Sequence, residues 1–360
     1  MRRTAPLILG AGPAGCAAAI VLAQAGAHPL LVERDTVPGD ALCGGFLSWR
    51  TAARLERLGI DIAALGAQEV THLAIFAGGR QAELPLPDRG HGLSRRALDT
   101  ALRRRALELG ADLVTDRIRR TEGTTLVGQQ QDRASDSLFL ASGKHDVLGM
   151  GRPREGHDPA LGLRLRVTPG ETLRIRLAGR IELHLFDGGY AGIVLQEGGT
   201  ANICMALRKS LLVEAGGDPR ALLVLLAAAH PALGERLAAA APESPIDTIG
   251  AVPYGWIARD TTPGLFRLGD QAAVIPSLAG EGIAIALASG SRAAQAWLDG
   301  GAGAAPAFQR AFAHSARRPL AMAGLLRAVA ERPTGSGLVA ALALRAPALL
   351  RLVARLTRLD

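Results

Sequence analysis

The residues whose spacing most clearly implies chemistry lie near the start of the chain. Gly10, Gly12 and Gly15 form a G-x-G-x-x-G pattern, and an acidic residue, Glu33, follows at the distance typical of a dinucleotide site. Such glycines permit a tight turn and a close approach of the backbone to a pyrophosphate, which the free N–H groups of the next helix then bind. The pattern predicts that a dinucleotide is bound by Gly10, Gly12, Pro13, Ala14, Gly15, Glu33 and Arg34.

The elements around this pattern must place it at the edge of a parallel sheet. We expect a strand at 5–9, a helix at 14–24 and a strand at 28–32, because two apolar runs flank a stretch of small residues. Glu33 closes the second strand and would accept both hydroxyls of an adenosine ribose, whereas its charge would repel a 2′-phosphate. The site is therefore predicted to prefer FAD or NAD over NADP. A plain strand–helix turn is the alternative, and the spaced Glu33 argues against it.

Three later segments bear on the choice between FAD and NAD. A loop of small residues at 40–48 contains Cys43-Gly44-Gly45. Arg95 begins an R-x-x-L-D pattern that opens an amphipathic helix, and residues 265–283 contain Gly269-Asp270 and Gly280-Glu281-Gly282 before another helix. Each segment alone could be a turn and a helix cap. Together with the N-terminal pattern they favour FAD.

The order of these motifs resembles the FAD-dependent oxidoreductases of the para-hydroxybenzoate hydroxylase fold, a flavin monooxygenase family, and within them the geranylgeranyl reductase-like branch. The resemblance covers roughly residues 4 to 300. It implies that Asp270 bonds the ribityl chain of FAD, that Arg95 lies near the pyrophosphate, and that a helix N-terminus at 280–283 faces the flavin, where its dipole stabilises negative charge. The cofactor residues that it implies are Cys43, Gly44, Arg95, Gly269, Asp270, Gly280, Gly282 and Ile283.

Two residues are candidates for a catalytic role by the same resemblance. Cys43 matches the cysteine of a Cys-Gly-Gly loop beside the isoalloxazine, and Tyr190 matches a Gly-Tyr element that lines the cavity. The alternatives are a small buried thiol for Cys43 and core packing for Tyr190. We expect Tyr254 and Trp256 to face the cavity as well. Cys16 and Cys204 are interpreted as structural.

The segment Ser142-Gly143-Lys144-His145-Asp146 departs from the resemblance. Aromatic hydroxylases of this fold carry an Asp-Gly motif there, which is tied to the handling of NAD(P)H. NAD(P)H is still the expected electron donor, without a separate domain for it, because no second G-x-G-x-x-G is present. Lys144, Arg152 and Arg154 could meet a phosphate, but we expect them to form a solvated loop.

The predicted fold class is α/β with an α+β insert. It comprises a Rossmann-like FAD-binding domain, an antiparallel-sheet substrate domain and a C-terminal helical tail. Short apolar runs between turns predict strands at 161–167, 172–177, 181–186, 191–196 and 201–207, followed by a helix at 221–237. We predict an FAD-binding domain at 1–67, 92–150 and 244–300, a substrate domain at 68–91 and 151–243, and C-terminal helices at 301–360.

The amino-acid composition limits which classes of binding partner are expected for this protein. The net charge of +8 would attract phosphates, anionic membranes or nucleic acid, but aromatics are only 3% and are not interleaved with arginine, so no nucleic acid is expected. The three cysteines lack a C-x-x-C spacing and the histidines do not cluster, so we expect no metal and a reduced cytoplasmic protein. An uncharged run at 4–32 could suggest a signal peptide or a membrane span, but its glycines and prolines disfavour both.

The last segment, 306–360, is rich in Ala, Leu and Arg and is predicted to be helical, with a break at 333–337. Its final helix has a basic stripe of Arg351, Arg355 and Arg358 beside an apolar one. Such a helix suits peripheral contact with a membrane, or docking on its own body or on a partner subunit. We favour docking, and the oligomeric state stays open.

These patterns predict an FAD-dependent oxidoreductase that acts on a small molecule. A monooxygenase that hydroxylates a phenolic or polyketide-like compound is favoured. An FAD-dependent C=C reductase of a lipid or isoprenoid-like substrate and a non-catalytic FAD-binding subunit are the alternatives. The chain has neither G-x-x-x-x-G-K-[ST] nor G-x-S-x-G, which argues against a P-loop NTPase and against a serine hydrolase.

Overall fold

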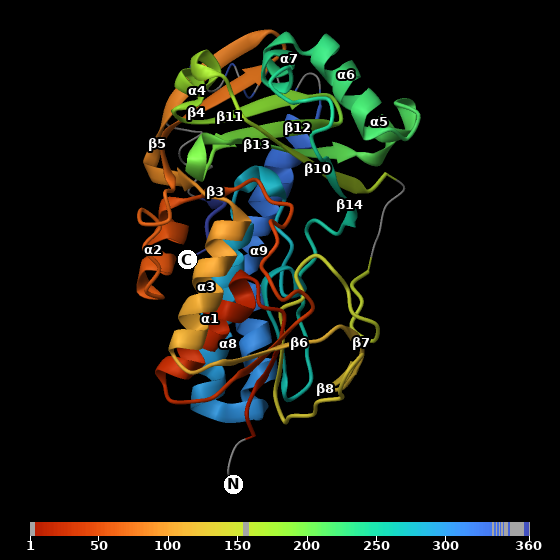
Figure 1. The fold of residues 1–360 in the computed structure, drawn as a ribbon. Helices are drawn as coiled ribbons and strands as arrows, with labels where there is room; N and C mark the ends of the chain where they lie inside the picture. Colours follow the sequence, from red (N-terminus) through yellow and green to blue (C-terminus); the bar gives the residue numbers. More distant parts are fainter. Residues whose placement is uncertain are drawn as a thin grey trace.

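A computed structural model gives the arrangement of the elements. It describes residues 4–153, 158–332 and 356–359, together with the single residues 335, 337, 339, 341 and 345. Figure 1 shows two lobes, one built around a parallel sheet and the other around a larger sheet. The mixed α/β class, the Rossmann-like domain and the second sheet agree with the prediction.

The smaller sheet is parallel and carries the predicted dinucleotide pattern. Its strands stand in the order β15-β9-β1-β2-β6, and all of their pairings are parallel. The bounds are β1 (Leu7–Leu9), β2 (Leu30–Glu33), β6 (Asp112–Thr115), β9 (Leu138–Leu140) and β15 (Leu265–Arg267). Alternate side chains reach opposite faces, so Ile8 packs toward the helices while Leu7 and Leu9 pack toward Leu126.

Three helices cover one face of this sheet: α1 (Pro13–Gln24), α3 (Arg95–Glu108) and α8 (Gly282–Gly300). A short hairpin of β7 (Ile118–Glu122) and β8 (Thr125–Gly128) covers the other face. Small residues let α1 and α8 approach closely, and a Cβ on Gly290 would lie 2.2 Å from the Ala14 carbonyl oxygen. This packing fixes the N-termini of two helices near one cavity.

The larger sheet has the order β14-β10-β13-β12-β11-β4-β5-β3. Its pairs are antiparallel except for β11 with β4, which is parallel. The bounds are β3 (Phe46–Leu47), β4 (Gln68–Ala77), β5 (Arg80–Gly92), β10 (Ala160–Val167), β11 (Gly179–Phe186), β12 (Gly189–Leu195), β13 (Ala201–Arg208) and β14 (Asp247–Val252).

Four short helices lie on the outer face of the larger sheet: α4 (Glu171–Leu177), α5 (Lys209–Glu214), α6 (Pro219–Ala229) and α7 (Pro231–Leu237). The inner face turns toward the lobe with the parallel sheet. Two further helices, α2 (Trp49–Arg57) and α9 (Ala305–Ala330), connect the lobes. Among the described residues, no helix is long and apolar enough to cross a bilayer.

The predicted strand at 172–177 is wrong, because these residues form the helix α4. The alternation Leu173, Ile175, Leu177 suggested a strand, but Ile175 is 64% exposed, and only Leu173 and Leu177, four residues apart, pack on the core. The predicted helix at 221–237 is observed as two helices that meet at Pro231. A proline inside the run removes a backbone hydrogen bond and breaks it.

Two strands outside the predicted substrate segments also join the larger sheet. They are β3, and β14, which pairs with β10. The exact domain bounds otherwise stay a prediction. Residues 333, 334 and 336 of the predicted break, and most of the last helix, lie outside the described residues.

Candidate functional site

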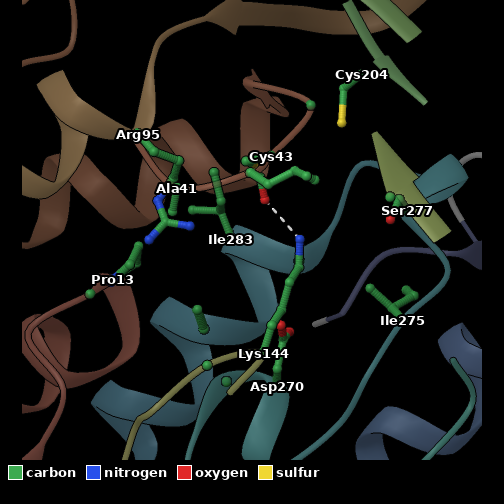
Figure 2. A pocket seen from close by; sticks show the side chains of 18 of the residues that line it. Pro13, Ala41, Cys43, Arg95, Lys144, Cys204, Asp270, Ile275, Ser277 and Ile283 are labelled. Atoms are coloured by element: carbon green, nitrogen blue, oxygen red, sulfur yellow. Dashed lines mark hydrogen bonds between the residues drawn. The ribbon is translucent and has the colours of Figure 1, made fainter. Parts of the chain in front are cut away.

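A single cavity of about 910 Å³ collects nearly all of the predicted cofactor residues. It runs between the carboxyl ends of the parallel strands and the inner face of the larger sheet (Figure 2). The predicted residues that line it are Gly10, Gly12, Pro13, Ala14, Glu33, Arg34, Cys43, Gly44, Arg95, Gly269, Asp270, Gly280, Gly282 and Ile283. Gly15 alone is absent from the lining, because it packs under the turn.

The three glycines of the N-terminal pattern do different things. Gly10 has φ +105°, and a Cβ there would lie 2.5 Å from the Ala141 carbonyl oxygen. A Cβ on Gly15 would lie 1.9 Å from the Gly10 carbonyl oxygen, so both glycines are required by the turn itself. A Cβ on Gly12 meets only the Arg95 guanidinium, at 3.5 Å, and would project at the mouth of α1. The free space beside Gly12 is thus a cradle for a phosphate.

Glu33 stands at the end of β2 and lines the cavity. Its carboxylate accepts hydrogen bonds from the Ala11 N–H at 2.8 Å and from the Arg34 N–H at 2.8 Å. These bonds fix the carboxylate beside the glycine turn. The Arg34 side chain is exposed and pairs with Asp35 at 3.0 Å.

Arg95 places a permanent positive charge at the same mouth. Its guanidinium donates to both carboxylate oxygens of Asp99, at 2.8 and 2.7 Å. Burial lowers the pKa of Arg95, but the Asp99 charge and hydrogen bonds more than offset this and raise it above its usual value. A fixed guanidinium next to Gly12 suits a pyrophosphate.

The other end of the cavity is formed by the start of α8. Gly280 has φ +66° and turns the chain so that Gly282 opens the helix, which aims backbone N–H groups at the cavity. Glu281 beside it is fully buried and forms an ion pair with Arg358. Burial raises the pKa of Glu281, and the Arg358 charge opposes that shift.

The predicted solvated loop around Lys144 is wrong for two of its three residues. Lys144 lines the cavity, and its ammonium group donates to the Leu42 carbonyl at 2.7 Å (Figure 2). Arg152 is 5% exposed and bonds Asp146 and the Asp270 and Lys144 carbonyls. The Leu42 and Asp270 carbonyls are more than a hundred residues away in the chain, so the sequence did not reveal them as acceptors. Arg154 lies outside the described residues.

The cysteines differ in their surroundings. Cys16 is buried under the glycine turn, and burial raises the pKa of its thiol. Cys204 was interpreted as purely structural, yet it lines the cavity, and burial raises its pKa to about 12. Cys43 lies in the 40–45 loop and accepts a weak hydrogen bond from the Gly45 N–H at 3.5 Å. A catalytic role for Cys43 remains a prediction.

The part of the cavity against the larger sheet is apolar. The lining residues that β4, β5, β11 and β12 contribute carry no charge; they are Leu73, Ile75, Leu84, Pro85, Leu86, Pro87, Ile181, Leu183, Leu185, Tyr190 and Gly192. Leu326 and Ala330 of α9 close it from the other side. We call this part the apolar chamber. Such a surface favours an apolar ligand over an ionic one.

Hydroxyl groups stand where the apolar chamber meets the rest of the cavity. Tyr254 and Ser277 lie 2.5 Å apart, hydroxyl to hydroxyl. The Tyr190 hydroxyl is buried and makes no hydrogen bond of standard geometry with the described residues. Burial raises the pKa of Tyr190 well above its usual value, so it is a neutral donor. Trp256, which we expected in the lining, packs instead beside Arg152 and lies outside it.

Four functional candidates were missed from the sequence: Asp40, Arg164, Asn202 and Ser277. Arg164 and Asn202 face inward from strands that read as ordinary apolar runs. The arginine and asparagine interrupting those runs were the available signal, since a buried polar residue in a strand requires a partner. No group of three metal-ligating side chains occurs in the part of the chain that the structure describes.

Comparison with known proteins agrees with this geometry. Residues 3–140 match the family model described as an FAD binding domain. The menaquinone reductase of Mycobacterium tuberculosis is 29% identical over 220 residues, which cover 55% of this chain and 53% of that protein. The chain therefore spans about half the length of this curated relative. Digeranylgeranylglycerophospholipid reductase 2 of Methanopyrus kandleri is 28% identical over 79% of this chain and 74% of its own length.

A solved flavin-dependent brominase superposes with a TM-score of 0.77 and 18% identity, covering 98% of this chain and 92% of the brominase. At that identity the likeness shows the shared fold. The glycine cradle, the fixed Arg95 and the start of α8 fit an FAD molecule along the cavity. The predicted resemblance is confirmed: the chain contains an FAD-binding domain, and it is similar in sequence to menaquinone and geranylgeranyl reductases and in fold to flavin-dependent monooxygenases and halogenases.

Proposed function

We propose that the protein is an FAD-dependent reductase that adds two hydrogens to a C=C bond in a lipid-like substrate with a polyprenyl chain. The observation that carries the proposal is the apolar chamber, which is continuous with the predicted flavin site. The two curated relatives named above, a menaquinone reductase and a digeranylgeranylglycerophospholipid reductase, support it, since both names denote substrates with polyprenyl chains.

The chain's own residues would hold the cofactor and the charge that develops on it. FAD supplies the hydride-transfer chemistry when bound. The cradle at Gly12 and the Arg95 guanidinium would hold the pyrophosphate, and Asp270 the ribityl chain. The N–H groups at the start of α8 would stabilise negative charge at the pyrimidine edge.

The substrate would lie with its chain in the apolar chamber and its polar end near the hydroxyl groups. The Tyr190 hydroxyl, which makes no hydrogen bond of standard geometry with the described residues, would donate one to an oxygen of the substrate. Placing a long apolar chain against the leucines and isoleucines of β4 and β11 contributes binding free energy of roughly 25 cal/mol per Å² of buried apolar surface. The chamber also excludes water from the reacting carbon atoms.

The electron donor is proposed to be NAD(P)H. No described feature is a second nucleotide fingerprint, so the donor would bind transiently at the cavity mouth. Anaerobic addition of NADPH or NADH should bleach the bound flavin. Bleaching with dithionite alone would reject NAD(P)H and indicate a protein or quinol donor.

The proposal is tested with a single turnover. Holoprotein reduced by dithionite, freed of excess reductant and kept anaerobic, is mixed with a menaquinone bearing an unsaturated polyprenyl chain in detergent. We expect the flavin to reoxidise without oxygen and the product to gain two hydrogens in its chain by mass spectrometry. Flavin that stays reduced and an unchanged quinone would reject this substrate class.

Hydroxylation of a phenolic or polyketide-like compound is the second candidate. The hydroxyl cluster of Tyr190, Tyr254 and Ser277 favours it, because such groups can orient a phenol. In this case oxygen is consumed and the product gains one oxygen atom. A bound flavin that no reductant reduces would instead favour the non-catalytic FAD-binding subunit.

A further inference from the structure

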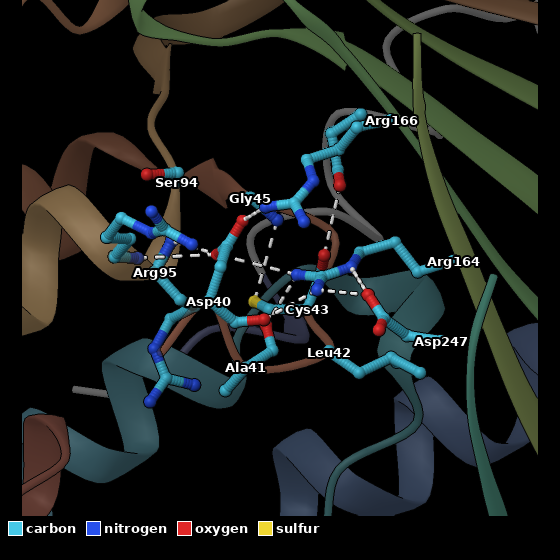
Figure 3. A network of polar contacts seen from close by, with 12 residues as sticks. Asp40, Ala41, Leu42, Cys43, Gly45, Ser94, Arg95, Arg164, Arg166 and Asp247 are labelled. Atoms are coloured by element: carbon cyan, nitrogen blue, oxygen red, sulfur yellow. Dashed lines mark hydrogen bonds and ion pairs between the residues drawn. The ribbon is translucent and has the colours of Figure 1, made fainter. Parts of the chain in front are cut away.

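The loop at 40–44 is held in an unusual way: all of its backbone carbonyls accept hydrogen bonds from side chains of other segments. Figure 3 shows the part of this arrangement around Arg164 and Asp40. A loop that makes no sheet or helix bonds would ordinarily turn these oxygens to water. Here the loop lines the cavity beside the predicted isoalloxazine position. Its path is therefore set by the side chains that grip it.

Arg164 of β10 grips the first two carbonyls. Its guanidinium donates to the Asp40 carbonyl at 2.5 Å and to the Ala41 carbonyl at 2.8 Å, and it also pairs with the Asp247 carboxylate. The side chain is 3% exposed, so these bonds are screened little by water. Because the planar guanidinium donates in fixed directions, it sets the orientation of the two carbonyl groups as well as their distance from Arg164.

Two other side chains grip the rest of the loop. Lys144 donates to the Leu42 carbonyl at 2.7 Å. Asn202 of β13 is fully buried, and its amide nitrogen donates to the Cys43 and Gly44 carbonyls at 3.0 and 2.9 Å. Because both partners are carbonyl oxygens, only the nitrogen can face them.

The side chain of Asp40 links the 40–44 loop to the predicted pyrophosphate site. Its carboxylate accepts from the Arg95 N–H at 3.1 Å and the Arg96 N–H at 3.3 Å, which caps α3, and it pairs with Arg166. The backbone N–H groups from Ala41 to Gly44 have no partner among the described residues. They are the donors that this clamped loop leaves available.

We propose that Arg164, Asn202 and Lys144 form a carbonyl clamp that holds the 40–44 loop so that its free N–H groups bind the flavin. Two of the three clamp residues belong to the substrate sheet, so the sheet that binds substrate also sets the position of the flavin-facing loop. These are positioning residues, since they act through the loop. The inference rests on FAD occupying the cavity.

The test compares Arg164→Lys and Asn202→Leu with wild type in the full chain. Lysine keeps the charge but cannot donate to two carbonyls with a fixed fork, and leucine has nearly the shape of asparagine without its donors. We expect the Kd for FAD, measured by quenching of flavin fluorescence, to rise about tenfold or more in each variant. We also expect a more negative midpoint potential, because donors to the reduced flavin are displaced.

Arg236→Lys is the matched control. Arg236 is also buried and also binds a carboxylate with a fork, that of Glu182, but it lies on the outer face of the sheet. It should lose thermal stability while keeping the wild-type Kd and potential. An unchanged Kd and potential in folded Arg164→Lys and Asn202→Leu would overturn the clamp. Equal changes in Arg236→Lys would overturn it too, whereas a wild-type protein that binds no FAD would defeat the proposed function instead.

Discussion

At the scale of single residues, the glycines of the N-terminal pattern have two roles: some are needed for the fold and one for binding of the cofactor. A Cβ on Gly10 would meet the Ala141 carbonyl oxygen and a Cβ on Gly15 the Gly10 carbonyl oxygen, whereas Gly12 faces the open cradle. Gly12 also has φ −83°, which any residue adopts. A methyl group at these positions therefore has different consequences.

We expect Gly15→Ala to destabilise the fold, because its Cβ would lie 1.9 Å from the Gly10 carbonyl oxygen. Gly12→Ala should leave the melting temperature near that of wild type and raise the Kd for FAD at least about tenfold, since the methyl group fills the phosphate cradle. Thermal melts of the apoprotein and FAD titrations measure the two effects. Gly303→Ala, in open space, is the control. A Gly12→Ala protein that binds FAD normally would contradict the cradle.

Tyr190 gives a second prediction at this scale. Tyr190→Phe keeps the ring packing and removes a buried hydroxyl that makes no hydrogen bond of standard geometry with the described residues. We expect FAD binding to be unchanged and the single-turnover rate with an oxygen-bearing substrate to fall about tenfold, the value of one hydrogen bond of about 1.4 kcal/mol. Rapid-scanning absorbance during turnover measures it. An unchanged rate would assign Tyr190 to packing alone.

At the scale of elements, the sequence predicted those helices, strands and site residues that are determined by residues close together in the chain. The G-x-G-x-x-G turn, α1 and Glu33 are encoded within one βαβ unit, so both the elements and the site residues could be predicted. The strand at 172–177 failed because a surface alternation of Leu and Ile imitates a strand. The roles of Arg164 and Asn202 could not be predicted, since their partners are carbonyls more than a hundred residues away.

The outer face of the larger sheet carries a buried charged group that makes stability depend on pH. The Glu182 carboxylate accepts hydrogen bonds from His184 at 2.9 Å and from the Nε–H and Nη2–H groups of Arg236. Burial raises the pKa of Glu182, but these hydrogen bonds and the Arg236 charge lower it overall, and burial lowers the pKa of His184. Both residues therefore bind a proton more tightly in the unfolded chain than in the folded protein.

Because both folded pKa values lie below their unfolded ones, this stability is fully present above about pH 6.5 and is lost as the pH falls through the folded values. We expect the urea midpoint of wild type to fall between about pH 7 and pH 4. The fall should be smaller in the double variant Glu182→Gln/His184→Gln, in which neither side chain can take up a proton. Equal slopes in the two proteins would contradict the assignment.

At the scale of the whole molecule, the last described residues return to the flavin end of the cavity. Arg358 pairs with Glu281 at the start of α8, donates to the Ala279 carbonyl at 3.1 Å and lies 4.8 Å from the Trp49 ring. The Leu359 carbonyl accepts from Arg54 at 3.0 Å. Arg358 is thus docked on the body, whereas Arg351 and Arg355 lie outside the described residues. Peripheral contact with a membrane stays a prediction.

Removal of the Arg358 charge would leave the buried Glu281 carboxylate without its ionic partner, which should destabilise the folded state. We expect Arg358→Met to lose about 3 kcal/mol of stability at about pH 8, as is typical when one partner of a buried ion pair is removed. The loss should shrink at about pH 5, since an unpaired buried carboxyl has a raised pKa and is stabilised by protonation there. Urea titrations at both pH values measure it, with exposed Arg345→Met as control. A loss that does not vary with pH would contradict the pairing.

One cavity between the two sheets is proposed to hold FAD in place for reduction of an apolar substrate. The visible absorption spectrum of the purified protein, incubated with FAD, desalted and then reduced anaerobically, tests it most directly. We predict a yellow protein with one flavin per chain that bleaches on reduction and regains its colour when a polyprenyl substrate is added without oxygen. A protein that stays colourless after incubation with FAD would show that the cavity does not hold this cofactor.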